Sequence, residues 1–581
     1  MNLRPLAWLG VSLGMAACAQ VPLHPGEAAK SAPPREARAA ATAPGKTVSD
    51  AQLPKEHLTP QVLYEYLLAE IAAQRGQVRL AADAYLDLAR RTHDPRIAER
   101  ATQVALYARE PEAALDAARI WAQADPHSQP ADQTVAILLA GTGHLKAARP
   151  RLERLLAAQK DPGPVFLHMA DFLANVPDKQ GVLSLVRTLA ARYPKLPEAH
   201  FAVAEAAWAA QEPNQALDEL RQAARLRPGW ELAAVAQARL LAATDPAKAL
   251  QFDERYLARF PQAAQVRLAY AKLLSLTHHD AEARAQFVHL AKAFPQNPEV
   301  ALAAGLLSLQ LKDYGAAHTY LEQTLSLGYR PDGVKFYLGQ LAEARDQTDQ
   351  AKHWYLGVDQ GPYYLAARMR YAALLAKEGH LDEAVDFLGH VSAKTDEEHV
   401  QIVLAQAELL REANDAHRAL GVLTQALATR PDNTDLLYDR ALTAVKLGRL
   451  RMAETDLRTV IRLKPQSAQA YNALGYTLAD KTRRFAEARQ LIGKALKLSP
   501  NDPFIIDSMG WVEYRMGHYA QALQYLKRAY AASADPQIAA HLGAALWKDG
   551  QPQAARTLWT QALKANPGNA ALERVMKEFG S

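Results

Sequence analysis

The only thiol in the 581-residue chain is Cys18, so neither an internal disulfide nor a multi-cysteine zinc or iron–sulfur site is available. The sequence has no Gly-rich phosphate loop, no GxSxG and no HExxH motif. Its 18 His residues are scattered apart from His278-His279, in a polar stretch that reads as a turn. Asp and Glu pairs at helical spacing are typical of solvated helix faces. We therefore expect no catalytic residue, no metal site and no cofactor.

The chemistry of Cys18 is set by the segment before it. Residues 1–17 have the parts of a secretory signal peptide: Arg4, an apolar stretch over residues 6–13 and a small-residue exit at Ala16-Ala17. The apolar stretch is too short for a transmembrane helix of about 20 residues. We expect an exported protein, with no other stretch that could cross a membrane.

The cleavage region LGMAAC resembles the lipobox of bacterial lipoproteins, with Met15 where Leu is most common. The resemblance implies that Cys18 is acylated and becomes the first residue of the mature protein. Ala19 stands where an Asp would favour retention in the inner membrane, so the resemblance implies a lipid anchor, carrying palmitate-type chains, on the periplasmic face of the outer membrane. An ordinary signal peptide with an incidental cysteine is the alternative.

Residues 18–57 show no helical or strand periodicity and are rich in Ala, charged residues and Pro. This composition is typical of a disordered linker. A flexible coil of about 40 residues has a root-mean-square span near 35 Å. We expect a lipidated N-terminus and a tether that lets the folded part stand off the membrane. Its prolines are Pro22, Pro25, Pro33, Pro34, Pro44 and Pro54.

A small residue recurs every 33 to 35 residues through the rest of the chain. In most units another Ala or Gly lies 12 residues earlier, which lets two antiparallel helix backbones approach closely. In many units Pro lies 12 residues later, where it ends a helix. The pattern predicts about fifteen helical hairpins. The recurring positions are Ala81, Ala114, Ala148, Val182, Ala216, Ala249, Ala283, Ala317, Ala351, Ala384, Ala419, Ala453, Ala488, Ala522 and Ala555.

A 34-residue helix–turn–helix unit with these small residues, a Gly in the turn and a Pro after the second helix resembles the tetratricopeptide repeat (TPR). The resemblance implies an all-α, right-handed superhelical solenoid over residues 58–570, with residues 571–581 as a C-terminal helix end. The units around Val182 and Ala249 are degenerate, so their boundaries stay open. The first helices of such a solenoid line a concave groove.

Charge argues against nucleic acid as a partner. Lys and Arg number 67 and Asp and Glu 62, a net charge of +5 with the two signs interspersed along the chain. A clustered basic footprint is therefore not expected.

The TPR resemblance also implies a protein-binding groove, because first-helix positions 2, 5, 9, 12 and 13 of the repeat face the concave side. Tyr, Trp and Arg are frequent at interface hot spots. Inter-repeat packing is the alternative for Trp511 and Trp547. The implied groove residues are Tyr438, Lys446, Asn472, Tyr476, Asp507, Trp511, Tyr514, Arg515, Trp547 and Lys548.

The segment from Leu58 to Arg109 resembles the start of a Gram-negative family of outer-membrane TPR lipoproteins that act as adaptors of a periplasmic carboxyl-terminal-processing protease. The resemblance implies a scaffold that recruits this protease and delivers peptidoglycan hydrolases to it. It also implies a protease contact near Tyr64, Tyr66 and Glu70. Two other classes are weighed against this non-catalytic adaptor: an assembly factor for a pilus, secretin or polysaccharide exporter, and an enzyme.

Overall fold

The computed structural model describes residues 59–580, which form 31 α-helices and no strand. These residues divide into two compact units, the N-terminal unit (59–307) and the C-terminal unit (308–580). The boundary between them falls inside α15 (Pro298–Gln310). The predicted signal peptide (1–17), the lipidated Cys18 and the tether (18–57) lie outside the described residues.

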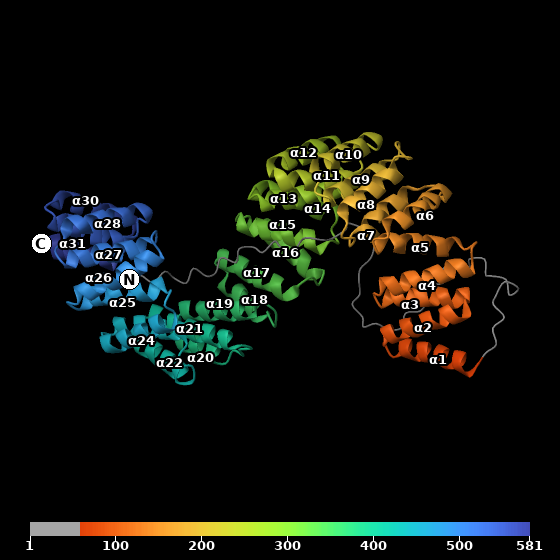
Figure 1. Ribbon diagram of the computed structural model, residues 1–581. Helices are drawn as coiled ribbons and strands as arrows, with labels where there is room; N and C mark the ends of the chain where they lie inside the picture. Colours follow the sequence, from red (N-terminus) through yellow and green to blue (C-terminus); the bar gives the residue numbers. More distant parts are fainter. Residues whose placement is uncertain (1–58, 581) are drawn as a thin grey trace. The chain divides into compact units, whose positions relative to one another are not determined.

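The N-terminal unit is a run of short helices in which each helix packs on the next (Figure 1). In order, its helices are α1 (Pro60–Gln74), α2 (Val78–Thr92), α3 (Pro95–Tyr107), α4 (Pro111–Ala124), α5 (Gln129–Gly141), α6 (Leu145–Ala158), α7 (Gly163–Leu173), α8 (Lys179–Ala190), α9 (Pro197–Ala209), α10 (Pro213–Leu226), α11 (Glu231–Thr244), α12 (Pro246–Arg259), α13 (Ala264–Leu276), α14 (Asp280–Ala293) and most of α15.

The C-terminal unit has the same construction. Its helices are α16 (Tyr314–Ser326), α17 (Pro331–Ala344), α18 (Thr348–Leu356), α19 (Tyr364–Lys377), α20 (Leu381–Gly389), α21 (Asp396–Glu412), α22 (Ala416–Thr429), α23 (Thr434–Lys446), α24 (Leu450–Leu463), α25 (Ala468–Lys481), α26 (Phe485–Leu498), α27 (Pro503–Arg515), α28 (Tyr519–Ala532), α29 (Pro536–Lys548), α30 (Pro552–Ala565) and α31 (Ala570–Gly580).

The 34-residue pattern is confirmed as the organising feature of both units. Each of the fifteen recurring positions is the fourth residue of an even-numbered helix from α2 to α30. The fourteen alanines have no exposed surface, and Val182 is 4% exposed. Because burial of the same position recurs once per repeat, the chain is an all-α solenoid of helical repeats.

Glycines on the first helices show why the pattern needs small residues. A Cβ added to Gly510 would stand 2.5 Å from Cγ of Leu526, and one added to Gly543 would stand 2.0 Å from Nε1 of Trp559. The small residue therefore lies directly beneath the large side chain of its partner helix, closer to it than to the partner's alanine. In the hairpin of α25 and α26, Gly475 is the small residue that lies beneath the large side chain, here Ile492.

Turn residues close the hairpins as the sequence predicts. Gly448 and Gly517 adopt φ values of 71° and 83°, in the left-handed region that glycine favours. Pro465 and Pro500 follow α24 and α26 by two residues, where their missing N–H groups remove the next helical hydrogen bond. The degenerate unit around Val182 departs from the pattern, because in α7 Met169 is buried while Ala170, twelve residues before Val182, is only half-buried.

Candidate protein-binding faces

The predicted groove residues lie on α23, α25, α27 and α29, and α27 packs beside both α25 and α29 (Figure 1). The structure brings four of them together with a fifth residue, His541. We call this set, Tyr476, Asp507, Trp511, Tyr514 and His541, the aromatic face. It spans three consecutive first helices of the C-terminal unit.

The centre of the aromatic face is the buried pair of Asp507 on α27 and His541 on α29. Nδ1 of His541 lies 2.9 Å and 3.0 Å from the two carboxylate oxygens of Asp507. The imidazole stacks on the indole of Trp511, with ring centroids 4.1 Å apart and planes 19° apart. Trp511 stacks in turn on Tyr514 at 4.9 Å. The stack and the hydrogen bond join two adjacent repeats.

Tyr476 extends the face onto α25. Its hydroxyl accepts a hydrogen bond from Nε2 of Gln537 at 3.0 Å, and its ring lies 6.1 Å from His541. Burial raises the pKa of the Tyr476 hydroxyl well above its ordinary value. Tyr476 is therefore a neutral phenol that ties α25 to α29 across α27.

Two polar atoms at this face are shielded from solvent and have no hydrogen-bond partner: Oδ1 of Asn472 and Nε1 of Trp511. An unpaired buried polar atom costs about 1–3 kcal/mol. The two atoms are an acceptor on α25 and a donor on α27, the complement of a peptide N–H and C=O.

Arg515 and Tyr514 occupy the end of α27. Nη1 of Arg515 donates to the backbone oxygen of Asp480 at 2.9 Å, and its guanidinium lies 5.4 Å from the ring centre of Phe485. Burial raises the pKa of Tyr514 to about 12. Arg515 thus connects α27 to the end of α25, and its guanidinium lies 3.7 Å from the carboxylate of Asp480.

Trp547 and Lys548 lie apart from the aromatic face. The Trp547 ring stacks 6.1 Å from Trp559 and lies 5.9 Å from Phe579 of α31, and Nζ of Lys548 is 5.6 Å from the same Phe579 ring. Residues 570–580 thus form a separate helix that packs on α29 and α30. Of the two alternatives for Trp547, the structure supports packing, because Phe579 of α31 lies against its ring.

Tyr438 and Lys446 on α23 are also separate from the aromatic face. Tyr438 packs among the core residues, where burial and the adjacent Asp439 raise its pKa to about 12. Nζ of Lys446 lies 3.4 Å from the backbone oxygen of Arg411. The buried guanidinium of the same Arg411 pairs with Asp439. These residues stabilise the junction of α21 and α23.

His541 is the member of the aromatic face that sequence reasoning missed. Its side chain is buried and polar, a combination that is rare without a partner. The repeat register gives no signal for it, because Ala522 and Ala555 are 33 residues apart whereas His541 follows Asp507 by 34. His541 therefore falls one position beyond the equivalent of Asp507 and outside the predicted groove positions.

The residues predicted at the N-terminus divide between two faces of α1. Tyr66 and Glu70 line a pocket of about 450 Å³ together with residues of α2 and α3. The hydroxyl of Tyr85 donates a hydrogen bond to Glu70, and its ring meets Tyr66 edge-on at 6.5 Å. Tyr64, by contrast, points elsewhere and is 64% exposed.

The other face of α1 is apolar and exposed. Leu63, Leu67 and Ile71 are 42%, 47% and 46% exposed. At about 100° per residue they fall with Tyr64 within roughly 100° of arc, opposite the buried Ala72. We call these four residues the α1 stripe. A terminal solenoid helix normally carries a polar outer face, so the α1 stripe is an exception that calls for a partner.

We searched the described residues for metal-ligand clusters and for membrane-spanning helices. Within residues 59–580 no three His, Cys, Asp or Glu side chains converge as metal ligands would. Over the same range, none of the helices combines the length and the apolar composition of a membrane span. His279, from the pair noted in the sequence, begins α14 and its Nδ1 lies 2.9 Å from the hydroxyl of Thr277.

Comparison with known proteins agrees with the repeat geometry. Tetratricopeptide-repeat family models match residues 406–474, 468–502 and 508–571. The TPR repeat-containing protein PA4667 of Pseudomonas aeruginosa is 33% identical over 483 residues, 83% of this chain and 82% of that protein. Human tetratricopeptide repeat protein 13 is 30% identical over 126 residues, 22% of this chain and 14% of that protein.

Solved structures of repeat proteins are also similar. The Cut9-Hcn1 hetero-tetramer of the APC/C matches at 15% identity and a TM-score of 0.32, covering 91% of this chain and 99% of that one. A tetratricopeptide repeat protein from Parabacteroides merdae matches at 15% identity and a TM-score of 0.36, covering 43% of this chain and 99% of that one.

The repeat is typically a non-catalytic scaffold for protein–protein interaction. The periodic burial of its alanines and the relative that matches over 83% of its length lead to one assignment: the chain belongs to the tetratricopeptide-repeat proteins.

Proposed function

We propose that this protein is an adaptor anchored to the outer membrane through Cys18. In this proposal the α1 stripe binds a periplasmic carboxyl-terminal-processing protease, and the aromatic face receives the peptidoglycan hydrolases that the protease cleaves. The single observation that carries the protease contact is the α1 stripe, an apolar surface at the end of a solenoid.

The chemistry of the stripe suits a protein partner. Exposed apolar patches on soluble proteins mark docking sites, and aromatic and aliphatic anchors supply most of the energy at such interfaces. The adjacent pocket adds polar groups, because Glu70, Asp94 and Arg100 lie at its rim or wall. A partner helix or loop could thus bury the stripe and form hydrogen bonds in the pocket.

The aromatic face has different chemistry, which supports a second and separate site. It offers stacked Trp511 and Tyr514 rings that are only half-buried, a surface that suits an extended peptide segment. The face lies in the C-terminal unit and the stripe in the N-terminal unit. A scaffold with two sites can hold an enzyme and its substrate together and so raise their effective concentration.

The test is capture of the purified protease by the full-length chain carrying Leu63→Ser and Leu67→Ser. We expect at least a tenfold loss of affinity, because two anchors of a buried contact are removed. The matched control is Leu276→Ser, since Leu276 is 78% exposed in the same unit and lies outside the stripe. Equal affinity of the stripe variant and the wild type, with both folded by circular dichroism, would refute the protease contact.

A further inference from the structure

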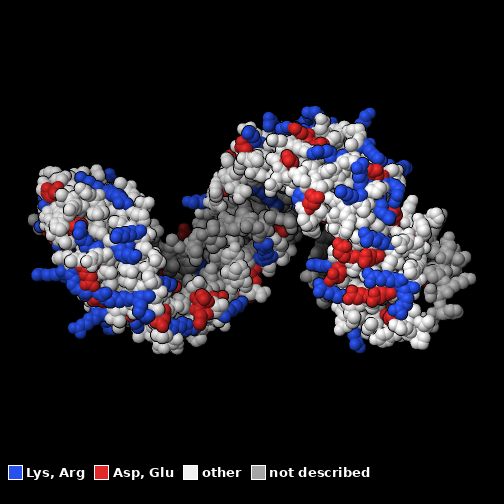
Figure 2. Space-filling model, in the orientation of Figure 1, with Lys and Arg blue, Asp and Glu red and all other residues white. Residues whose placement is uncertain are grey.

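The C-terminal unit carries a surplus of positive charge in one stretch of its sequence. Residues 449–499 contain eleven Lys or Arg and four Asp or Glu, a surplus of seven, against +5 for the whole chain. The formal charges of all the other residues therefore sum to −2. Positive and negative residues are nearly balanced over the rest of the chain, whereas positive residues are in excess in this stretch. The stretch is a local exception to the interspersed charge from which we expect no nucleic-acid partner. Figure 2 shows blue side chains gathered where Figure 1 places α26.

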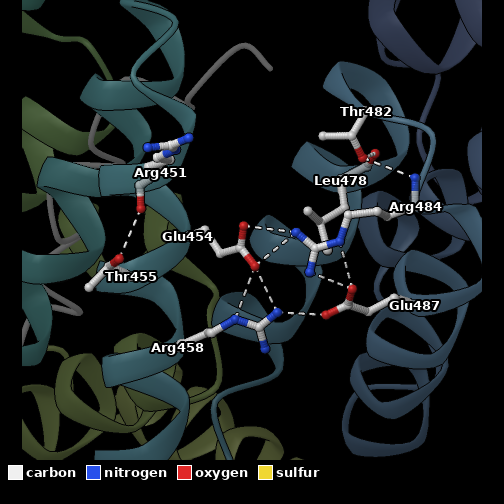
Figure 3. A network of polar contacts seen from close by, with 8 residues as sticks. All are labelled: Arg451, Glu454, Thr455, Arg458, Leu478, Thr482, Arg484 and Glu487. Carbon is white, nitrogen blue, oxygen red and sulfur yellow. Dashed lines mark hydrogen bonds and ion pairs between the residues drawn. The ribbon is translucent and has the colours of Figure 1, made fainter.

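The four acidic residues of this stretch are buried or half-buried, and each of them forms ion pairs. Glu454 on α24 and Glu487 on α26 form a closed ring with Arg458 and Arg484 (Figure 3). The four ion pairs of the ring measure 2.6–2.9 Å. Arg458 and Arg484 hold the pKa values of both carboxyls below their ordinary value through hydrogen bonds and charge. The ring joins two adjacent repeats and leaves neither acid exposed.

The other two acids of the stretch are paired as well. Asp456 is buried and bonded to Arg440 by two contacts of 2.8 Å. Asp480 lies 2.9 Å from Lys481 and 3.7 Å from Arg515. All eleven basic side chains between residues 449 and 499 are exposed, whereas none of the four acids is. Six of the eleven basic side chains are ion-paired, three of them with acids outside the stretch: Arg462 with Asp432, Lys464 with Asp435 and Arg489 with Glu513.

Five of these cations have no ion-pair partner among residues 59–580, and we call them the basic face. Within the stretch 449–499 there is also no exposed large apolar side chain. A protein interface usually has an apolar core, so this surface, which has no exposed large apolar side chain, does not have the composition of a protein-docking site. It has the composition of a surface that adsorbs to phosphates. The basic face consists of Arg449, Arg451, Arg483, Lys494 and Lys497.

We propose that the basic face binds the phosphate groups of an anionic phospholipid surface. The proposal rests on the membrane-anchored location in the proposed function, which brings the chain close to phospholipid and away from nucleic acid. A lipid anchor gains stable attachment from a second signal such as a polybasic patch. Each Lys or Arg near an anionic surface contributes about a fivefold gain in partitioning. The bond is electrostatic, with no side chain inserted into the acyl region.

The experiment measures flotation of the purified full-length chain, unacylated at Cys18, with vesicles of phosphatidylglycerol and phosphatidylcholine or of phosphatidylcholine alone. The N-terminal segment is common to every protein compared, so differences report on the substitutions. We expect at least tenfold stronger binding to the phosphatidylglycerol vesicles, with affinity falling steeply between 50 and 300 mM salt, in keeping with screening of charges. Replacing the five residues of the basic face by Gln should reduce this preference at least tenfold.

A matched control variant loses the same number of positive charges, at positions spread over the other unit. It carries five Gln substitutions of exposed basic residues in the N-terminal unit and should stay within about threefold of the wild type. Equal losses in both variants, or no preference for phosphatidylglycerol, would overturn the proposal. So would binding of duplex DNA as tight as binding of the vesicles at the same salt. Neither variant touches the α1 stripe, so protease capture tests the proposed function separately. The control substitutions are Arg75→Gln, Arg109→Gln, Lys146→Gln, Lys160→Gln and Arg225→Gln.

Discussion

The imidazole of His541 stacks on the indole of Trp511 with ring centroids 4.1 Å apart. Because the two residues belong to adjacent first helices, the stack is at once a candidate binding surface and a contact between repeats. Trp511 is half-buried, which leaves one part of its surface for a ligand. The alternatives of binding and packing are therefore not exclusive at this position.

Trp511→Ala should lower the free energy of unfolding by about 2–4 kcal/mol, since it removes a half-buried aromatic ring and two stacked contacts. Trp511→Phe should keep most of the stack and lose less. Chemical denaturation of both variants checks the order. An alanine variant as stable as the wild type would show that the stack contributes nothing to the junction of the repeats.

Gly543→Ala should destabilise the C-terminal unit by roughly 1–3 kcal/mol, because the added Cβ would stand 2.0 Å from Nε1 of Trp559. Gly421→Ala is the matched control. Gly421 lies inside α22 with no atom within 4 Å of an added Cβ, so alanine there should stabilise by about 0.5–1 kcal/mol. Opposite shifts in melting temperature are expected, and shifts of the same sign would contradict the packing described.

Asp253 on α12 should make the stability of the N-terminal unit depend on pH. Its carboxylate is 1% exposed and has no hydrogen-bond partner, and burial raises its pKa to about 7. The folded state therefore binds more protons than the unfolded chain between about pH 4 and pH 7. The unfolding free energy should fall by roughly 4 kcal/mol as the pH rises through this window.

Asp253→Asn removes this dependence, because the amide does not ionise. We expect the variant to melt above the wild type at pH 8 and close to it at pH 4. Differential scanning calorimetry at both values measures the difference. A wild type whose stability is constant from pH 4 to pH 8 would show that Asp253 is ionised in the folded state.

Cys18→Ser should release the protein from the membrane fraction, since the lipobox-like LGMAAC segment leaves no other acyl acceptor of this kind. Stable anchoring needs more than one acyl chain, so the wild type should incorporate a labelled fatty acid and the variant should not. A wild type that remains unlabelled while staying in the membrane would contradict lipid anchoring through Cys18.

The repeats could be predicted from the sequence because one physical requirement recurs in every unit. Ala81 and Ala555 begin the second helices of distant hairpins, and both are fully buried for the same reason: two helix backbones meet there. Where the requirement is met differently, as at Met169 or at Gly475, the register shifts by one residue.

The candidate site was less predictable because its contacts depend on neighbouring repeats. Trp547 matched the groove pattern, yet Phe579 of α31 packs against it, and no periodic signal announces a terminal helix. His541 lies outside the groove positions of the repeat and joins the face through its bond to Asp507. Side-chain pairing across repeats needs three-dimensional register, which the helical period alone does not provide.

The central claim is that one chain holds a protease and its substrate at separate sites. The most direct measurement is cleavage of a purified peptidoglycan hydrolase by the purified protease in the presence of the full-length chain. The α1-stripe variant, Leu63→Ser with Leu67→Ser, should abolish stimulation of cleavage while still binding the hydrolase. Trp511→Phe with Tyr476→Phe, which preserves the rings, should weaken hydrolase binding while the protease still binds. If each variant loses both partners, or neither variant changes cleavage, the two-site adaptor is contradicted.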